Sequence, residues 1–114
     1  VYEGATGMSV LTSPRSYGTL IEFPIVADID NDRSAEIVYV SNFGTSPTVT
    51  VLQDSQSRWV ASRRIWNQHA YHVTNVREDG TIPQVMKQSW QLLNTFRTNS
   101  QIGEEGDCAP EPPN

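Results

Sequence analysis

Five residues between positions 28 and 36 carry the oxygen atoms best suited to hold a metal ion. The segment reads Asp-Ile-Asp-Asn-Asp-Arg-Ser-Ala-Glu, so that Asp28, Asp30 and Asp32 alternate and Glu36 takes the ninth position. Calcium takes about six to eight oxygen ligands, whereas four carboxylates gathered without a cation repel one another. The spacing therefore predicts a calcium-binding loop with Asp28, Asp30, Asp32, Glu36 and the backbone carbonyl of Ser34 as ligands.

The segments on both sides of this loop read as β-strands. Residues 20–27 are apolar and rich in β-type residues, and residues 35–40 have the β-branched run of a buried strand. An EF-hand needs flanking helices and an acidic residue at the twelfth position, which here is Tyr39. The loop is therefore expected to join two strands. The alternative is an acidic turn with solvated carboxylates, and magnesium, which keeps its waters, suits the loop less well.

A histidine pair offers a different chemistry. His69 and His72 are three residues apart; on a helix they would share a face and could bind zinc, or one could act as an acid–base group with Glu78 or Asp79. No cysteine stands near them, and no nucleophile motif of the Gly-x-Ser-x-Gly kind occurs. Structural hydrogen bonding is the favoured interpretation and no catalytic residue is assigned, although a polysaccharide-degrading enzyme with a histidine base stays open.

The aromatic residues could form a sugar-binding platform. Exposed rings stack on sugars, which would make the chain a carbohydrate-binding module, whereas aromatics at this density more often pack a small core. Core packing is the favoured interpretation. The four residues concerned are Trp59, Trp66, Tyr71 and Trp90.

The composition limits the class of protein. The chain has 114 residues and a formal net charge of -5, which suits one small domain and a cation as partner. Lys and Arg are too few and too scattered for nucleic acid, and no run of about 18 apolar residues predicts a membrane span. The single Cys108 is either a free thiol on a flexible tail or half of a bridge to another chain segment.

Further strands and one helix are expected outside the loop. Residues 1–3 and 8–11 form a hairpin around the turn 4–7, residues 48–52 alternate as a half-buried strand, and residues 58–61 can pair back across the turn 54–57. Residues 83–97 then read as a helix with Pro83 in its first turn. The apolar stripe of that helix is Val85, Met86, Trp90, Leu93 and Phe96, together with Leu92.

A weak internal repeat suggests that these strands belong to a repeated structure. Val1 aligns with Val51 and Val10 with Val60, an offset of about 50 residues that is close to the blade length of β-propellers. Phe-Pro-Ile-Val-Ala-Asp-Ile-Asp-Asn-Asp at 23–32, followed by Ala-Glu-Ile-Val at 35–38, resembles an FG-GAP or VCBS-type repeat. That repeat is the calcium-loop blade of integrin-like β-propellers in secreted bacterial proteins. Residues 64–83 and 94–99 resemble a segment that closes the FG-GAP region in large surface proteins.

The resemblance covers roughly residues 1–100 and implies a mainly β fold, in which antiparallel propeller-blade strands carry a calcium loop. Residues 1–12 would be the outer hairpin of a preceding blade, 20–62 one four-stranded blade, 63–99 an irregular segment with the C-terminal helix, and 100–114 a flexible tail or linker. One departure concerns Arg33, because the family usually places Gly at this sixth loop position, where the backbone turns sharply.

The function implied by the resemblance is non-catalytic. A calcium-stabilised propeller module would act in extracellular adhesion, or as a structural part of a secreted or surface assembly of a bacterium. Its expected partners are calcium and the upstream blades, or other chains and copies, that complete the sheet. Glycans are the expected partners in the carbohydrate-binding alternative.

Overall fold

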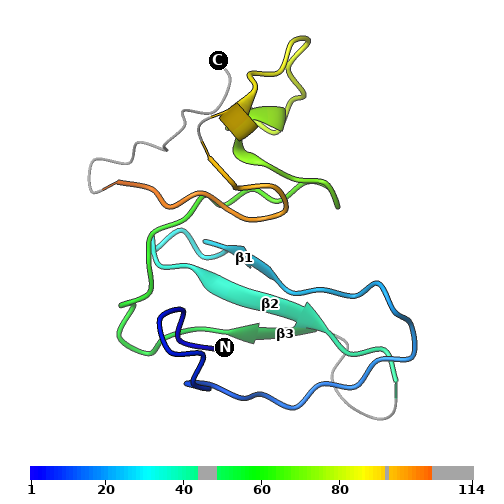
Figure 1. The fold of residues 1–114 in the computed structure, drawn as a ribbon, viewed down its shortest axis with the longest axis vertical. Helices are drawn as coiled ribbons and strands as arrows, with labels where there is room; N and C mark the ends of the chain where they lie inside the picture. Colours follow the sequence, from blue (N-terminus) through cyan, green and yellow to red (C-terminus); the bar gives the residue numbers. More distant parts are fainter. Residues whose placement is uncertain (44–48, 92, 104–114) are drawn as a thin grey trace.

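A three-stranded antiparallel sheet forms the centre of the computed structural model, which describes residues 1–43, 49–91 and 93–103. The strands β1 (Ile25–Ala27), β2 (Glu36–Val40) and β3 (Val49–Leu52) lie in the order β1-β2-β3 (Figure 1). β2 is the longest strand, and its β-branched side chains suit a pleated surface. β1 starts directly after Pro24, which has no N–H to donate to a ladder. The mainly β, antiparallel prediction is confirmed.

The register gives the sheet two unlike faces. Val38 pairs with Val51 and Val40 with Val49, so these four side chains share one face. On this face Val40, Val49 and Val51 are exposed, with Val49 at 60%. On the opposite face Ile37 pairs with Leu52, next to the buried Tyr39.

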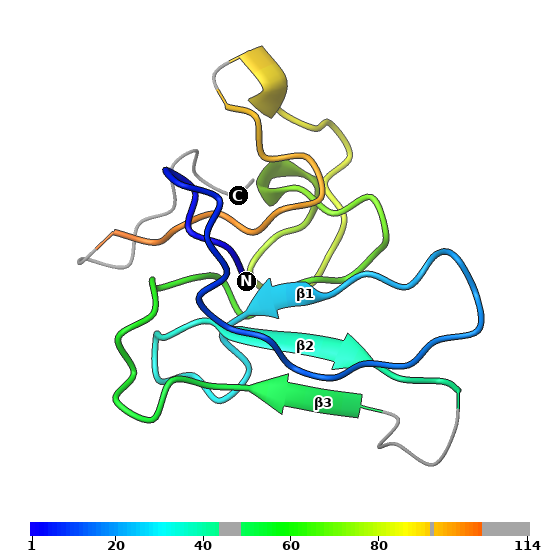
Figure 2. The same cartoon turned by 60° about the horizontal axis from the view of Figure 1, so that its bottom comes forward.

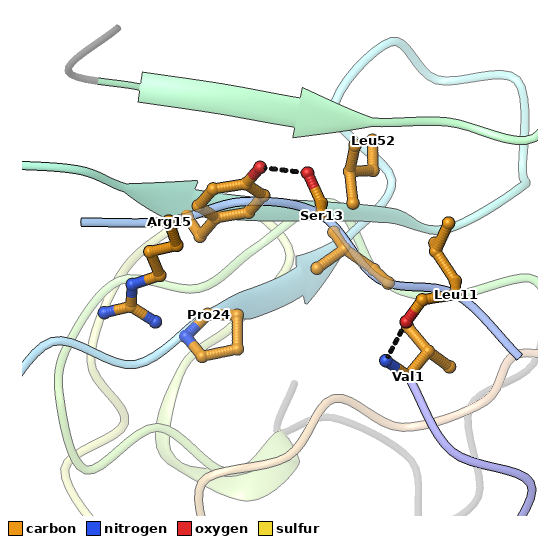
Figure 3. Close-up of a pocket in the computed structure, with 8 residues that line it drawn as sticks. Val1, Leu11, Ser13, Arg15, Pro24 and Leu52 are labelled. Carbon is orange, nitrogen blue, oxygen red and sulfur yellow. Dashed lines mark hydrogen bonds between the residues drawn. The ribbon is translucent and has the colours of Figure 1, made fainter. Parts of the chain in front are cut away.

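The N-terminal segment covers that second face. Its hairpin is confirmed by the bridge between Tyr2 and Ser9, and the chain then crosses the sheet (Figure 2). Ser13 shares a hydrogen bond of 2.5 Å with the Tyr39 hydroxyl. Figure 3 shows Leu11 and Leu52 among the residues that line the pocket of about 200 Å³ that remains between this segment and the sheet.

The expected helix over residues 83–97 is wrong. The described part of the chain contains no α-helix, only two short 3-10 helices, η1 (Val73–Asn75) and η2 (Ser89–Gln91). Backbone and side-chain groups here bond to distant partners: the Thr74 hydroxyl donates to the Lys87 carbonyl, and the Arg97 N–H donates to the Tyr71 carbonyl. These tertiary bonds replace the helical ladder, and most of the proposed stripe is exposed, including Val85 at 83%.

The fourth blade strand is absent as well. The turn after β3 forms as expected, since the Ser57 N–H donates to the Asp54 carbonyl, but residues 58–61 do not return along β3. They run toward the acidic loop instead, where the Val60 carbonyl accepts a hydrogen bond of 3.0 Å from the Ala35 N–H. The sheet of the described residues therefore has three strands, and the proposed match between residues 1–10 and 51–60 does not extend to their pairing.

The C-terminal segment, which comprises residues 62–103 without residue 92, packs beside β1 (Figures 1 and 2). Arg63 is 1% exposed and donates to the carbonyls of Val73 and Val76 at 3.0 Å each, while its Nε pairs with Glu78 at 2.6 Å. Asn99 joins this segment to the sheet, because its amide group donates to the Val26 and Arg63 carbonyls. Neither role was recognised in the sequence.

The start of the expected tail is ordered by pairing. Ser62 bridges to Gln101, and the Ile102 N–H donates to the Ala61 carbonyl at 2.9 Å. Residues 104–114, with Cys108, lie outside the described residues, as do Thr48 of the expected third strand and Leu92. Within the described ranges, no helix is both long enough and apolar enough to cross a membrane.

Candidate metal centre

The register of β1 and β2 brings the ends of the acidic loop together. Ala27, the last residue of β1, pairs with Glu36, the first residue of β2, so that Asp28 and Glu36 leave the sheet side by side. One carboxylate oxygen from each of Asp28, Asp30 and Glu36 lies within 4.8 Å of the others. These three residues are the one group of its kind among the residues the structure describes, and they could hold a metal ion.

Backbone N–H groups of the loop hold the aspartates in place. Asp28 accepts hydrogen bonds from the Asn31 N–H at 2.6 Å and the Arg33 N–H at 3.0 Å. Asp30 accepts one from the Asp32 N–H at 3.2 Å. Short acidic side chains bond readily to the backbone a few residues ahead, so the alternation of the sequence itself folds the loop around Asp28.

Glu36 is the most deeply buried member of the group, with 1% of its surface exposed. Its Oε2 accepts a hydrogen bond from the Ile29 N–H at 2.9 Å, while its Oε1 is buried without a partner among the described residues. Burial raises the pKa of Glu36, and the charges of Asp30, Asp32 and Asp28 raise it further against the hydrogen bond from Ile29. A buried, unpaired carboxylate oxygen is costly, and a cation beside it removes the cost.

Ser34 brings a second unpartnered oxygen to the loop. The residue is 3% exposed, and its hydroxyl Oγ has no hydrogen-bond partner among the described residues. The sequence pointed to the backbone carbonyl of Ser34 as the ligand. The orphaned atom found here is the hydroxyl, which is also an oxygen donor that calcium accepts.

Asp32 does not belong to the group of three. Its carboxylate accepts hydrogen bonds from the Ser57 hydroxyl at 2.6 Å and from the Ser34 N–H at 2.7 Å. The hydrogen bond from Ser57, followed by that from Ser34, lowers the pKa of Asp32. Gln53 similarly donates to Asp30 at 2.9 Å. Ser57 and Gln53 were not foreseen as partners of the loop, because their approach depends on the path of the chain after β3.

Two loop residues other than glycine adopt left-handed backbone angles. Arg33 has φ 75 and Asn31 has φ 65. Asn tolerates this region because its side chain bonds locally, whereas Arg carries the full steric cost. The sharp turn expected at the sixth loop position is present at Arg33, whose Nη2 also donates to the Gly103 carbonyl at 3.0 Å.

The donor set fits a hard divalent cation. Every candidate ligand in the loop supplies oxygen, and two of the three clustered carboxylates are buried. Within the loop, Glu36 and Ser34 each have a buried oxygen without a described partner. Calcium and magnesium both prefer such ligands. Asp28, Asp30 and Glu36 would hold the ion, with Ser34 as a neutral donor.

The histidines are separated by their contacts. The His69 ring packs edge-on against Phe23, with centroids 4.8 Å apart, and His72 Nε2 lies 3.1 Å from the sulfur of Met86. The carboxylates considered as their partners are engaged elsewhere: Glu78 with Arg63, and Asp79 with the N–H and hydroxyl of Thr81. No third zinc ligand joins the pair among the described residues.

The four aromatic residues occupy different environments. Tyr71 is fully buried and packs on Trp66, with ring centroids 4.9 Å apart. Trp59 is half-buried, and Trp90 is 63% exposed and lines a separate pocket together with His72.

Comparison of the chain with protein-family models, with curated proteins and with solved structures gave no match.

Proposed function

We propose that this chain is a non-catalytic calcium-binding β-sheet module. In this proposal the ion binds Asp28, Asp30 and Glu36 and ties the end of β1 to the start of β2. The observation that carries the proposal is the buried Oε1 of Glu36, which has no described partner inside a group of three carboxylates. The ion supplies positive charge there, and the loop supplies its position through backbone hydrogen bonds.

Two further observations support a role in a larger extracellular assembly. The sheet face formed by Val40, Val49 and Val51 is exposed and apolar, as expected where a neighbouring blade, another chain or a second copy packs. Extracellular modules bind calcium weakly, with dissociation constants of about 10⁻⁴–10⁻³ M, and the strained backbone at Arg33 suits a site of that class. Together with the FG-GAP resemblance, they favour adhesion or architecture at a bacterial surface.

Thermal unfolding with and without calcium tests the proposal. A ligand that binds only the folded chain stabilises it by about 1.4 kcal/mol at a concentration ten times its dissociation constant. We expect the Tm of the chain to rise by several degrees with millimolar calcium and to fall again after addition of a chelator. Magnesium at equal concentration should raise it less.

A pair of variants separates site binding from general salt effects. Glu36→Gln removes a clustered carboxylate and should abolish the calcium-dependent rise in Tm, whereas Glu3→Gln, at an exposed position in the N-terminal hairpin, should leave it unchanged. An equal calcium response in both variants, or none in the unaltered chain, would contradict the proposal.

A further inference from the structure

His72 and Met86 bring a nitrogen and a sulfur atom together outside the acidic loop. His72 Nε2 lies 3.1 Å from the sulfur of Met86, in a contact at the exposed surface of the protein. His72 directly precedes η1, and Met86 belongs to the stretch without regular secondary structure between η1 and η2. Neither residue belongs to the group of three carboxylates, so the contact is separate from the proposed calcium centre.

Hydrogen bonds hold His72 in place. Its backbone N–H donates to Asn75 Oδ1 at 3.2 Å. The ring Nδ1 has an acceptor beside it, the Ala70 carbonyl oxygen at 3.3 Å, and a donor, the Asn75 amide nitrogen at 3.1 Å. Either neutral tautomer of the ring therefore has a partner at Nδ1. With the proton on Nδ1, Nε2 offers its lone pair on the side of the Met86 sulfur, and a metal-bound histidine commonly donates its other ring N–H to a backbone carbonyl.

The chemistry of the two donors selects the ion. A thioether sulfur is a soft ligand that favours Cu(I), and an imidazole nitrogen suits copper as well. Calcium and magnesium take oxygen ligands, and zinc sites in proteins are built from Cys, His and carboxylates. Cu(I) is therefore the ion that both donors at this contact favour.

The geometry of the contact admits one ion bonded to both atoms. Bonds of about 2.0 Å to nitrogen and about 2.3 Å to sulfur, the lengths found in zinc sites, span the 3.1 Å with an angle of about 90° at the ion. The Met86 side chain is 42% exposed and has three rotatable bonds, so it can open that angle by a small movement. His72 also lines a pocket of about 180 Å³ together with Trp90 and Phe96, and its lining residues include no Asp or Glu. A site without carboxylates suits a soft monovalent ion better than a hard divalent one.

We propose that His72 and Met86 bind one Cu(I) ion at the surface of the C-terminal segment. His72 Nε2 supplies the nitrogen ligand and the Met86 thioether supplies the sulfur ligand. The ring stays neutral in the complex, because its one proton resides on Nδ1 and is donated to the Ala70 carbonyl. The ion remains Cu(I), so no electron is transferred.

Titration of the full chain with Cu(I) under argon, followed by NMR, tests the proposal. Every sample carries Cys108→Ser, because a thiolate would compete for the ion as a soft ligand. We expect the Met86 methyl and His72 ring signals to shift together and to saturate at one equivalent of Cu(I). The other methionine and the other histidine of the chain, Met8 and His69, should not respond. Absence of a saturable shift at Met86, equal shifts at Met8 and Met86, or the same methyl shift with Zn(II) would each overturn the proposal.

Matched variants identify the two ligands. Met86→Leu keeps an apolar side chain of similar size, and should weaken Cu(I) binding at least about tenfold in competition with a coloured Cu(I) chelator such as bicinchoninate. Met8→Leu is its control at another exposed methionine, and should leave the affinity unchanged. His72→Gln should cause a similar loss and His69→Gln none, with the fold of each variant checked in the NMR spectrum. Equal affinities of Met86→Leu and Met8→Leu would show that the Met86 thioether does not bind the ion, and would overturn the proposal.

Discussion

Glu36 shows what a single residue contributes to this protein. Its place at the start of β2 is set by the strand register, and its burial is set by the acidic loop folding over it. A carboxylate in this position opposes folding unless a cation or a proton neutralises it. Calcium and protons should therefore compete for the same group.

The stability of the metal-free chain should depend on pH through Glu36. Its pKa in the folded chain lies above the ordinary value of 4.5, because of burial and the neighbouring aspartates. The folded chain therefore binds this proton more tightly than the unfolded chain. The metal-free protein should gain stability as the pH falls from the folded pKa to 4.5, and lose that gain as the pH rises. Urea unfolding at a series of pH values in chelator measures the trend.

The comparison with calcium isolates the residue. Glu36→Gln should remove this part of the pH dependence, and saturating calcium should reverse its direction, because the ion requires the ionised carboxylate. If the free energy of unfolding of the metal-free chain did not change between neutral pH and pH 4.5, the raised pKa of Glu36 would be contradicted.

Arg33 allows a direct measurement of backbone strain. Arg33→Gly should be more stable than Arg33→Ala by about 1 kcal/mol, because Gly adopts φ 75 without the steric cost that any Cβ carries. Both variants lose the hydrogen bond from the Arg33 side chain to Gly103, so that their difference reports the backbone alone. Calcium affinity should follow the same order in an isothermal titration. Equal stability of the two variants would show that the left-handed turn is not adopted.

At the scale of elements, the residues around η1 are organised by a buried cation, Arg63. Arg63 satisfies the carbonyl of Val73, the first residue of η1, and that of Val76, the residue directly after η1. Its ion pair with Glu78 adds less, because the Glu78 side chain is 49% exposed and screened by water. The hydrogen bonds of one buried side chain thus satisfy backbone carbonyls that no regular ladder satisfies.

Removing that side chain should destabilise the segment strongly. Arg63→Met retains much of the volume and leaves two buried carbonyls without a donor, at a cost of about 3 kcal/mol in the free energy of unfolding. Arg64→Met changes the exposed neighbour and should cost less than about 0.5 kcal/mol. Chemical unfolding of both variants measures the difference, and similar values for the two would contradict the buried position of Arg63.

At the scale of the whole molecule, apolar residues are divided unevenly between inside and outside. Tyr71, Val73 and Val76 are completely buried, whereas Val49 and Val51 on one face of the sheet are exposed, as are Val85 and Trp90 outside the sheet. A small domain has few apolar groups to leave in water. This division is the reason to expect a further blade, chain or copy on the sheet.

Two substitutions test whether that face is free in the isolated chain. Val73→Ala should cost about 2 kcal/mol in the free energy of unfolding, since it removes fully buried methyl groups. Val51→Thr, at a position 45% exposed, should cost less than about 0.5 kcal/mol. A cost for Val51→Thr as large as that for Val73→Ala, growing with protein concentration, would show that a second copy covers the face in solution.

Local patterns foretold the sheet and the loop. β-branched runs, Pro24 and the alternation of Asp28, Asp30 and Asp32 act between near neighbours, and the structure has β1, β2 and the loop where they point. The clustering of Asp28 with Glu36 follows from the same register.

Only the tertiary structure decided the rest, because the interactions responsible join distant parts of the chain. The Ser57 hydroxyl donates to Asp32, which lies 25 positions earlier in the sequence and outside the group of three carboxylates. The Asn99 amide donates to the Val26 carbonyl, 73 positions earlier. The apolar spacing of residues 83–97 suggested a helix, but the Arg97 N–H donates to the distant Tyr71 carbonyl and the Lys87 carbonyl accepts from the Thr74 hydroxyl. A periodic pattern indicates which residues could share one face of a helix. Whether the helix forms depends on whether another part of the protein packs against that face.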